Sequence, residues 1–258
     1  MAPFLLLGLS ERRTSASGGR ERRLVRRATA FVTLALATAL LAAAAPSRAA
    51  GLDLRLGAFF PQAKSNLFSD AAELYFVDPK KDFRGLTGGI EYSTRLADNL
   101  ELGFSLDGFD RMKDTSYRDY THPDGAEIRQ TLKLSIVPLG ATIRFVPTGR
   151  RVAVAPYLGV GADLFYWRWR EYGDFIDFGD PANPIVADSF RSDGWKAGFH
   201  VTGGLRFRVT HDFAVVAEGR YQRAKAKMGD DFAPNGPGLE NEIDLSGFSA
   251  TVGLHVRF

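Results

Sequence analysis

From Gly51 onward the chain alternates between apolar and polar side chains with a period of two. Successive side chains of a strand point to opposite faces, so this period predicts strands with one apolar face. The last segment shows it most clearly, and its apolar face consists of Phe248, Ala250, Val252, Leu254, Val256 and Phe258. Eight segments follow the pattern: 52–60, 86–93, 100–107, 128–145, 152–166, 195–208, 215–222 and 248–258.

One of these segments changes phase in its middle. Leu132, Leu134 and Ile136 share one face, whereas the apolar residues of 139–145 occupy the other. An extra residue in the strand would restore the phase, and a β-bulge tolerates a proline that cannot donate a hydrogen bond. We therefore expect a bulge at Val137-Pro138.

The connections between the eight segments alternate between short and long. Short turns lie near 97–98, 148–149 and 211–212, and long polar loops cover 61–84, 110–126, 170–193 and 226–244. Short turns at one end, long loops at the other and an even strand count are typical of outer-membrane barrels. A soluble sandwich also alternates, but its charged face lies in water. The sequence predicts an all-β fold, an eight-stranded antiparallel up-and-down transmembrane β-barrel.

The first 49 residues have the three parts of a signal peptide. Residues 22–27 supply a basic start, 28–45 an apolar stretch and 46–49 a small-residue end, which predicts cleavage after Ala49. A short membrane anchor is the alternative. The basic region is unusually long, and a translation start near Leu24 would shorten it. We expect a signal peptide at 1–49 and a barrel at 50–258, in the outer membrane of a Gram-negative cell.

Charge and cysteine content exclude several classes of function. The chain has a net charge of +3, but residues 1–49 hold eight arginines and two glutamates. Without them, 33 basic and 30 acidic residues become 25 and 28, so the mature part is acidic. No basic surface is left to bind nucleic acid. The absence of cysteine excludes disulfides and thiolate zinc sites.

Three stretches resemble known outer-membrane proteins. Residues 137–145 (VPLGATIRF), followed by 155–161 (APYLGVG), are similar to a recurrent strand-turn-strand of small barrels, and 217–221 (AEGRY) resembles their penultimate strand. The region from Gly51 to Phe258 thus resembles the OmpA transmembrane domain, OmpX and OmpW, which implies an eight-stranded, porin-family barrel. The sequence ends at the last predicted strand, without OmpA's wall-binding domain, and its charged interior departs from the apolar lumen that OmpW implies.

The end of the last strand resembles the signal that the barrel-assembly machinery reads. Its apolar phase ends on the C-terminal residue, and the predicted assembly signal is Val252, Leu254, Val256 and Phe258. The other expected partners are periplasmic chaperones, outer-membrane lipid and lipopolysaccharide, the last through Arg168 and Arg170. We expect a monomer.

If the apolar face meets lipid, the polar face lines a lumen just wide enough for side chains to fill. Buried charges need partners, so we expect them to pair and plug the barrel, with a narrow ion path as the alternative. The predicted lumen charge network is Arg55, Glu91, Arg95, Glu101, Asp107, Arg129, Lys133, Arg144, Asp163, Lys196, His200, Arg206, Arg208, Glu218, Arg220 and Arg257.

The sequence predicts neither an enzyme nor a cofactor. His200 with Thr202, near Glu218, is the candidate for lipid-A-modifying chemistry, but no His-x-Ser strand motif is present. The acidic loops lack the residue spacing of a calcium site. Aromatic residues near the loop ends of strands predict a membrane-interface girdle of Phe60, Tyr92, Tyr166, Trp195 and Tyr221.

Overall fold

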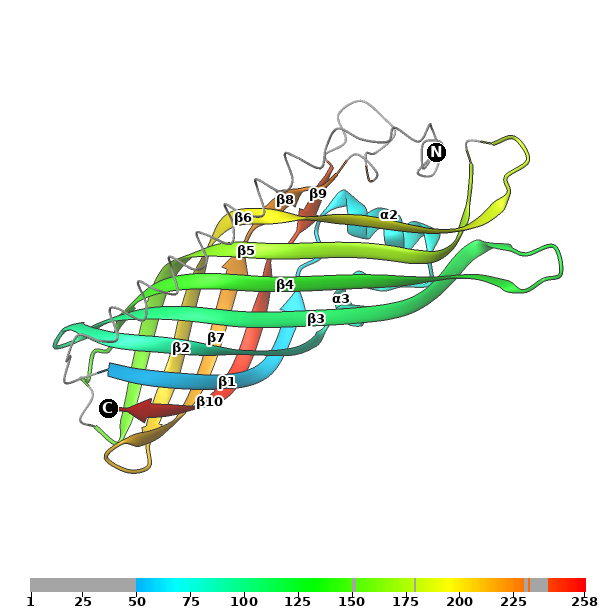
Figure 1. The fold of residues 1–258 in the computed structure, drawn as a ribbon. Coiled ribbons are helices and arrows are strands. Elements are labelled where there is room, and N and C mark those ends of the chain that lie inside the picture. Colours follow the sequence, from blue (N-terminus) through cyan, green and yellow to red (C-terminus); the bar gives the residue numbers. More distant parts are fainter. Residues whose placement is uncertain (1–49, 150–151, 179, 230–231, 233–240) are drawn as a thin grey trace.

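The computed structural model describes residues 50–149, 152–178, 180–229, 232 and 241–258. Eight strands form a closed antiparallel barrel in the order β1-β10-β7-β6-β5-β4-β3-β2, which confirms the predicted fold (Figure 1). Their bounds are β1 Ala50–Pro61, β2 Gly85–Ala97, β3 Leu100–Thr121, β4 Glu127–Phe145, β5 Val154–Ile176, β6 Ile185–Arg208, β7 Phe213–Arg223 and β10 Gly247–Arg257.

The barrel wall is uneven in height. Strands β3 to β6 have 19–24 residues, whereas β1, β2, β7 and β10 have 11–13. At one end, called here the turn end, the connections are short and Ala50 exchanges two backbone hydrogen bonds with Phe258. At the other, the loop end, β3 to β6 continue beyond the short strands as a curved wall (Figure 1).

Further elements pack at the loop end. Helices α2 (Asn66–Leu74) and α3 (Pro79–Asp82) lie between β1 and β2, and a two-stranded sheet of β8 (Lys225–Lys227) and β9 (Glu242–Asp244) precedes β10. Asp78 caps α3 by accepting hydrogen bonds from the backbone N–H of Lys80 and Lys81. No helix among the described residues is long and apolar enough to cross a membrane.

Two of the four predicted long loops are wrong in extent. Most of 110–126 and 170–193 is strand, so the β3–β4 and β5–β6 connections shrink to 122–126 and 177–184. These segments are polar on the outward face and apolar on the inward face. A strand whose outer face lies in water carries polar residues there, as a loop does. Polarity alone therefore did not separate loop from strand.

The bulge expected at Val137-Pro138 is also wrong. Strand β4 keeps one register with β3 from Phe145 to Arg129 and with β5 from Phe145 to Gln130. The apolar residues change face because their surroundings change. Leu139 faces outward, whereas Ile136, Leu134 and Leu132 are buried inside the loop-end wall.

The outer face carries an apolar band below the loop-end wall. On β5 its outward positions run from Val154 to Leu164, about 33 Å at ~3.3 Å per residue, or about 25 Å along the membrane normal at a tilt of roughly 40°. Tyr166 and Trp195 stand at the upper edge of the band and contact each other, with ring centroids 5.2 Å apart. Tyr92 pairs with Leu52 near the turn end, so its expected place at the loop end is wrong.

Candidate functional site

The interior of the barrel holds a set of paired charges that come from seven of its eight strands. We call this set the interior ion network; it consists of Arg55, Glu91, Glu101, Asp107, Arg144, Asp163, His200, Arg206, Glu218 and Arg220. All ten were predicted to lie in the lumen. The inward phase of each strand points these side chains into the lumen, where they meet across the barrel.

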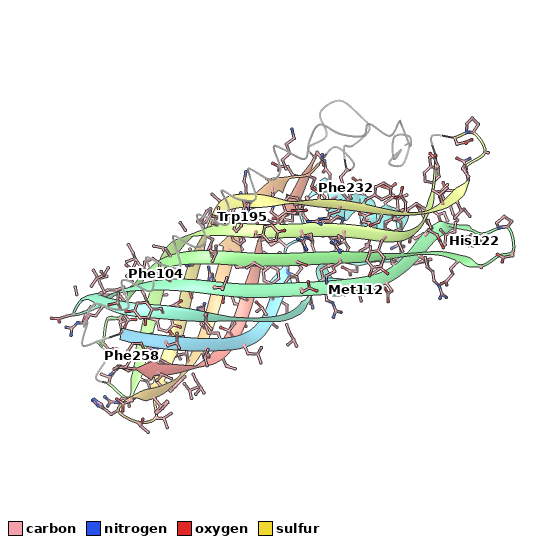
Figure 2. All side chains as sticks on the ribbon, in the orientation of Figure 1. Phe104, Met112, His122, Trp195, Phe232 and Phe258 are labelled. Carbon is pink, nitrogen blue, oxygen red and sulfur yellow. The ribbon has the colours of Figure 1, made fainter. Side chains whose placement is uncertain are left out.

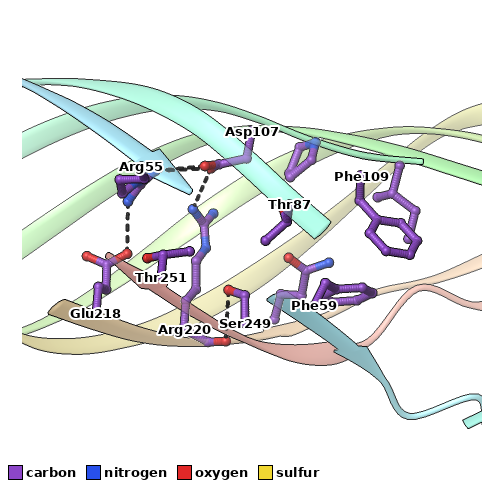
Figure 3. A pocket seen from close by; sticks show the side chains of 12 residues that line it. Arg55, Phe59, Thr87, Asp107, Phe109, Glu218, Arg220, Ser249 and Thr251 are labelled. Carbon is purple, nitrogen blue, oxygen red and sulfur yellow. Dashed lines mark hydrogen bonds and ion pairs between the residues drawn. The ribbon is translucent and has the colours of Figure 1, made fainter. Parts of the chain in front are cut away.

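Arg55 on β1 joins three strands. Its guanidinium lies 3.1 Å from Glu91 Oε2, 2.8 Å from Glu218 Oε1 and 3.0 Å from Asp107 Oδ1. Figure 3 shows Arg55 and Arg220 both directed at Asp107, and Arg220 Nη1 lies 3.0 Å from Asp107 Oδ2. Since Arg55 and Glu91 are buried, each charge is stabilised chiefly by its partners rather than by water.

Towards the turn end, two more arginines surround a tyrosine. Arg144 Nη2 is 2.6 Å from Glu91 Oε1, and Arg206 makes a two-pronged contact with Glu101 at 3.2 and 3.3 Å. Both guanidinium groups lie over the ring of Tyr157, at 4.6 and 5.7 Å from its centroid. This tyrosine was absent from the predicted network, although its inward phase on β5 was readable beside outward Leu158.

A histidine on β6 links the network to two neighbouring strands. His200 Nδ1 lies 2.7 Å from Asp163 Oδ2, and His200 Nε2 lies 2.9 Å from Thr142 Oγ1. The expected partner Thr202 instead donates to the Gly219 carbonyl. An acid, a histidine and a hydroxyl in line are the arrangement of a hydrolase triad.

The triad-like arrangement is enclosed. The side chains of His200 and Asp163 have no solvent exposure, and Thr142 is 1% exposed. Arg220 also contacts Asp163 Oδ1 and lies 3.0 Å from His200 Nδ1. The histidine is thus one member of an ion network.

Inward glycines leave space for these large side chains. A Cβ on Gly140 would lie 2.6 Å from Asp163 Oδ1 and 2.7 Å from Ser105 Oγ. A small barrel has little free interior volume, so charged side chains of this size require glycine opposite them.

Six predicted network residues lie elsewhere. Arg129 and Lys133 point outward, because their segment of β4 belongs to the loop-end wall, where the apolar face is the inner one. Arg95 and Arg208 are exposed at the turn end, where water reaches the barrel mouth, and Arg95 pairs with Asp98. Lys196 keeps the inward phase but is exposed on β6 near the height at which β7 ends, and Arg257 is half-buried at the turn end.

The inner side of the loop-end wall is an apolar core, called here the loop-end cap. Trp169 is fully buried and packs against Phe68 of α2 and Phe83, with ring centroids 5.6 and 5.3 Å apart. Its remaining members are buried between the wall and the segments that cover it. They are Phe59, Leu67, Ala71, Tyr75, Val77, Phe109, Tyr117, Ile128, Leu132, Leu134, Ile136, Phe165, Trp167, Ile176, Ala224, Ala226, Met228, Phe232, Ile243 and Leu245.

One carboxyl group is buried in the loop-end cap. Glu171 receives a hydrogen bond of 2.8 Å from Trp169 Nε1, its one hydrogen-bond partner among the described residues. Burial raises the pKa of Glu171 to about 7, because the apolar surroundings disfavour the charged form. The same burial and the nearby Glu171 raise the pKa of Tyr75 well above its ordinary value.

A small cavity separates the interior ion network from the loop-end cap (Figure 3). Its volume is about 20 Å³, and its lining changes from Arg55 and Asp107 on one side to Phe59 and Phe109 on the other. That space holds about one water molecule. In the part of the chain that the structure describes, no group of three acidic or histidine side chains is placed to hold a metal ion.

The predicted assembly signal lies at the C-terminal end of the described residues. Val252, Leu254 and Phe258 are exposed on the outer face at the C-terminus, where Phe258 is labelled in Figure 2. The predicted cleavage position, Ala49, lies outside the described residues.

Several solved structures are similar to this chain. Neisserial surface protein A is 19% identical, with a TM-score of 0.43 over 82% of this chain and 98% of that one. The Escherichia coli outer membrane protein W is 16% identical, with a TM-score of 0.39 over 82% and 99% of the two chains. The N-terminal barrel of Pseudomonas aeruginosa OprF is 14% identical, with a TM-score of 0.37 over 81% and 97%.

A search of curated protein sequences found no match. The family profile described as the outer membrane protein beta-barrel domain matches residues 31–258. With a closed eight-stranded barrel, an outer apolar band and a charged interior, the chain belongs to this family and is a protein of the outer membrane.

Proposed function

We propose that this protein is a non-enzymatic, monomeric barrel that acts through its loop end, in a structural or surface-interaction role. The loop end faces the cell exterior, and the turn end, with both ends of the barrel chain, faces the periplasm. The outward apolar phase of Val252, Leu254, Val256 and Phe258 serves as the signal for the barrel-assembly machinery.

The observation that carries this proposal is the stacking of two closing layers. The interior ion network fills the part of the barrel that the apolar band surrounds, called here the membrane zone. The loop-end cap covers this zone from above. A solute crossing the barrel would have to separate ion pairs such as Arg55–Glu218 and then displace the packed rings around Trp169. The cavity between the layers has room for about one water molecule.

Planar-bilayer recording tests the closed barrel. We expect no stable unitary conductance from the wild-type protein. Channel openings should appear only when both layers are weakened, by Arg55→Ser and Arg220→Ser in the interior ion network together with Trp169→Ala in the loop-end cap. Arg129→Ser with Lys133→Ser is the matched control, because both residues lie on the outer face. A stable wild-type conductance that the Arg55/Arg220 variant abolishes would support a narrow channel and contradict the proposal.

Mass spectrometry of lipid A tests the absence of enzymatic activity. We expect identical lipid A from cells with and without the protein, because the Thr142–His200–Asp163 group is closed to lipid and water. A change in acylation that His200→Gln removes would overturn this part of the proposal.

A further inference from the structure

The outer face of β4, β5 and β6 carries an ordered series of rows above the apolar band. In one row Leu139, Leu164 and Ala197 pair across the three strands. The next outward row up consists of Val137, Tyr166 and Trp195, and the next of Ser135, Arg168 and Asp193. Each step changes the chemistry, from aliphatic to aromatic to charged.

The next row up carries three like charges. Lys133, Arg170 and Arg191 are directly opposite one another on β4, β5 and β6. Met112 of β3, which is labelled in Figure 2, ends the row. We call these three residues the cation row. Like charges directly opposite each other destabilise a sheet. Each member of the row is therefore stabilised by any anion that lies beside it.

The carboxylates nearby pair with the two outer members of the cation row and not with the central arginine. Asp110 Oδ1 lies 3.1 Å from Lys133 Nζ, and Asp193 Oδ1 lies 2.6 Å from Arg191 Nε. Arg170, at the centre, has no ion pair or hydrogen bond from its side chain among the residues that the structure describes. Arg168 in the row below is held against Tyr166, whose hydroxyl lies 2.6 Å from its Nη2. Two guanidinium groups are thus left without a carboxylate.

The backbone of the cation row lies just above the headgroup layer, at a height from which its long side chains reach that layer. Arg170 is four residues above Tyr166, about 10 Å along the membrane normal at the same rise and tilt. The polar layer of a bilayer extends roughly 5–8 Å beyond the hydrocarbon on each side. Long basic side chains bend towards such a layer, so the cations reach the phosphates of lipids whose chains pack on the band below.

We propose that Lys133, Arg170 and Arg191 form a binding site for the phosphate groups of lipopolysaccharide in the outer leaflet. This inference rests on the proposed orientation, in which the loop end faces outward. Guanidinium groups bind phosphate through paired hydrogen bonds, and the aromatic pair Tyr166 and Trp195 supports the sugar–lipid boundary below them.

Native mass spectrometry from nanodiscs tests the site. The wild-type protein and a variant with Lys133→Gln, Arg170→Gln and Arg191→Gln are placed in phosphatidylcholine discs containing lipid A with both phosphates. We expect retained lipid A to fall by about tenfold or more in the variant, since each cation near a membrane surface contributes to anionic lipid binding. Arg170→Gln alone should show the largest single loss.

The control variant removes the same charge elsewhere. Lys80→Gln, Arg129→Gln and Lys227→Gln change exposed cations outside the row, and lipid A retention should stay within about twofold of wild type. Folding of each variant is checked by the faster gel migration of the unheated barrel. These substitutions leave the interior ion network unchanged, so the planar-bilayer recording tests the closed barrel independently of lipid A binding.

Four results would overturn the proposal. The cation-row variant could retain lipid A as wild type does. The wild-type protein could retain dephosphorylated lipid A, or phosphatidylglycerol, as well as the phosphorylated form, which would show general attraction to lipid. Millimolar inorganic phosphate could displace lipid A from the wild-type protein, which would assign the row to a free anion.

Discussion

Strands β3 to β6 run through both the membrane zone and the loop-end wall, and their polarity is opposite in the two regions. On β5, Leu164 faces outward beside inward Asp163 in the membrane zone, whereas Arg168 faces outward beside inward Trp169 in the loop-end wall. The backbone register does not change between them. The difference shows that the surrounding solvent selects which face of a strand is apolar: lipid requires an apolar exterior, and water requires an apolar core.

The two zones also differ in what holds them together. Membrane-zone side chains meet inside the barrel through ion pairs such as Arg144–Glu91. Loop-end side chains meet through aromatic packing around Trp169. Removing a charge from the membrane zone leaves its buried partner without a counter-charge. A charge added to the outer face of the loop-end wall is instead solvated by water.

The largest expected effect comes from Arg55→Met. It leaves the buried Glu91 and Glu218 and the half-buried Asp107 with one partner fewer, which should lower the free energy of unfolding by about 3–5 kcal/mol. Urea unfolding from phospholipid vesicles measures the change. The control Arg129→Met changes an exposed arginine of the loop-end wall and should alter stability by less than about 0.5 kcal/mol. Equal effects at both positions would refute the contrast between the zones.

A charge placed on the outer face should separate the two zones directly. Val160→Arg introduces a cation near the middle of the apolar band and should destabilise the barrel by about 2–4 kcal/mol. Thr131→Arg, outward on β4 in the loop-end wall, should cost less than about 0.5 kcal/mol because its site lies in water. The same vesicle assay compares them, and a neutral Val160→Arg would place the band outside the membrane.

The smallest expected effect is a pH dependence confined to the loop-end cap. The pKa of Glu171 is raised from 4.5 to about 7 in the folded protein, so its contribution to stability is complete below pH 4.5 and is lost as pH rises through about 7. The loss should be at most about 3 kcal/mol at a rate of ~1.4 kcal/mol per pKa unit.

Hydrogen exchange of the α2 amides, corrected for the intrinsic rate at each pH, measures this change. Glu171→Gln should remove the slope and stabilise the cap at pH 8, while Glu127→Gln, an exposed control, should leave it unchanged. A cap equally stable at pH 5 and pH 8 in the wild-type protein would contradict the raised pKa.

The membrane zone was predicted well because one rule governs all of it. Inward phase alone brought ten charged residues into the predicted lumen, among them Arg55, Glu91 and Glu218, and the structure pairs all ten. Sequence did not reveal which charges would pair, since that depends on register between strands far apart in the chain. Thr142 rather than Thr202 meets His200 for this reason.

The loop-end wall was predicted poorly because the same rule was carried past the membrane. A transmembrane strand needs about 9–11 residues, so a count from Phe145 along β4 already places Lys133 outside the bilayer. That count would have shown that Leu132, Leu134 and Ile136 form a core and that no bulge is needed at Val137-Pro138.

The sequence by itself determined the eight barrel strands, because each strand carries its period of two within itself. The alternation of short and long connections and the resemblance to small barrels indicated the family and the outer-membrane location. Only the tertiary structure decided where the apolar face turns inward, which charges meet and how α2 covers the wall. Those features depend on contacts between distant segments and on whether lipid or water surrounds each height of the barrel. The alternation of side chains within one strand contains no information about distant contacts or about the surrounding solvent.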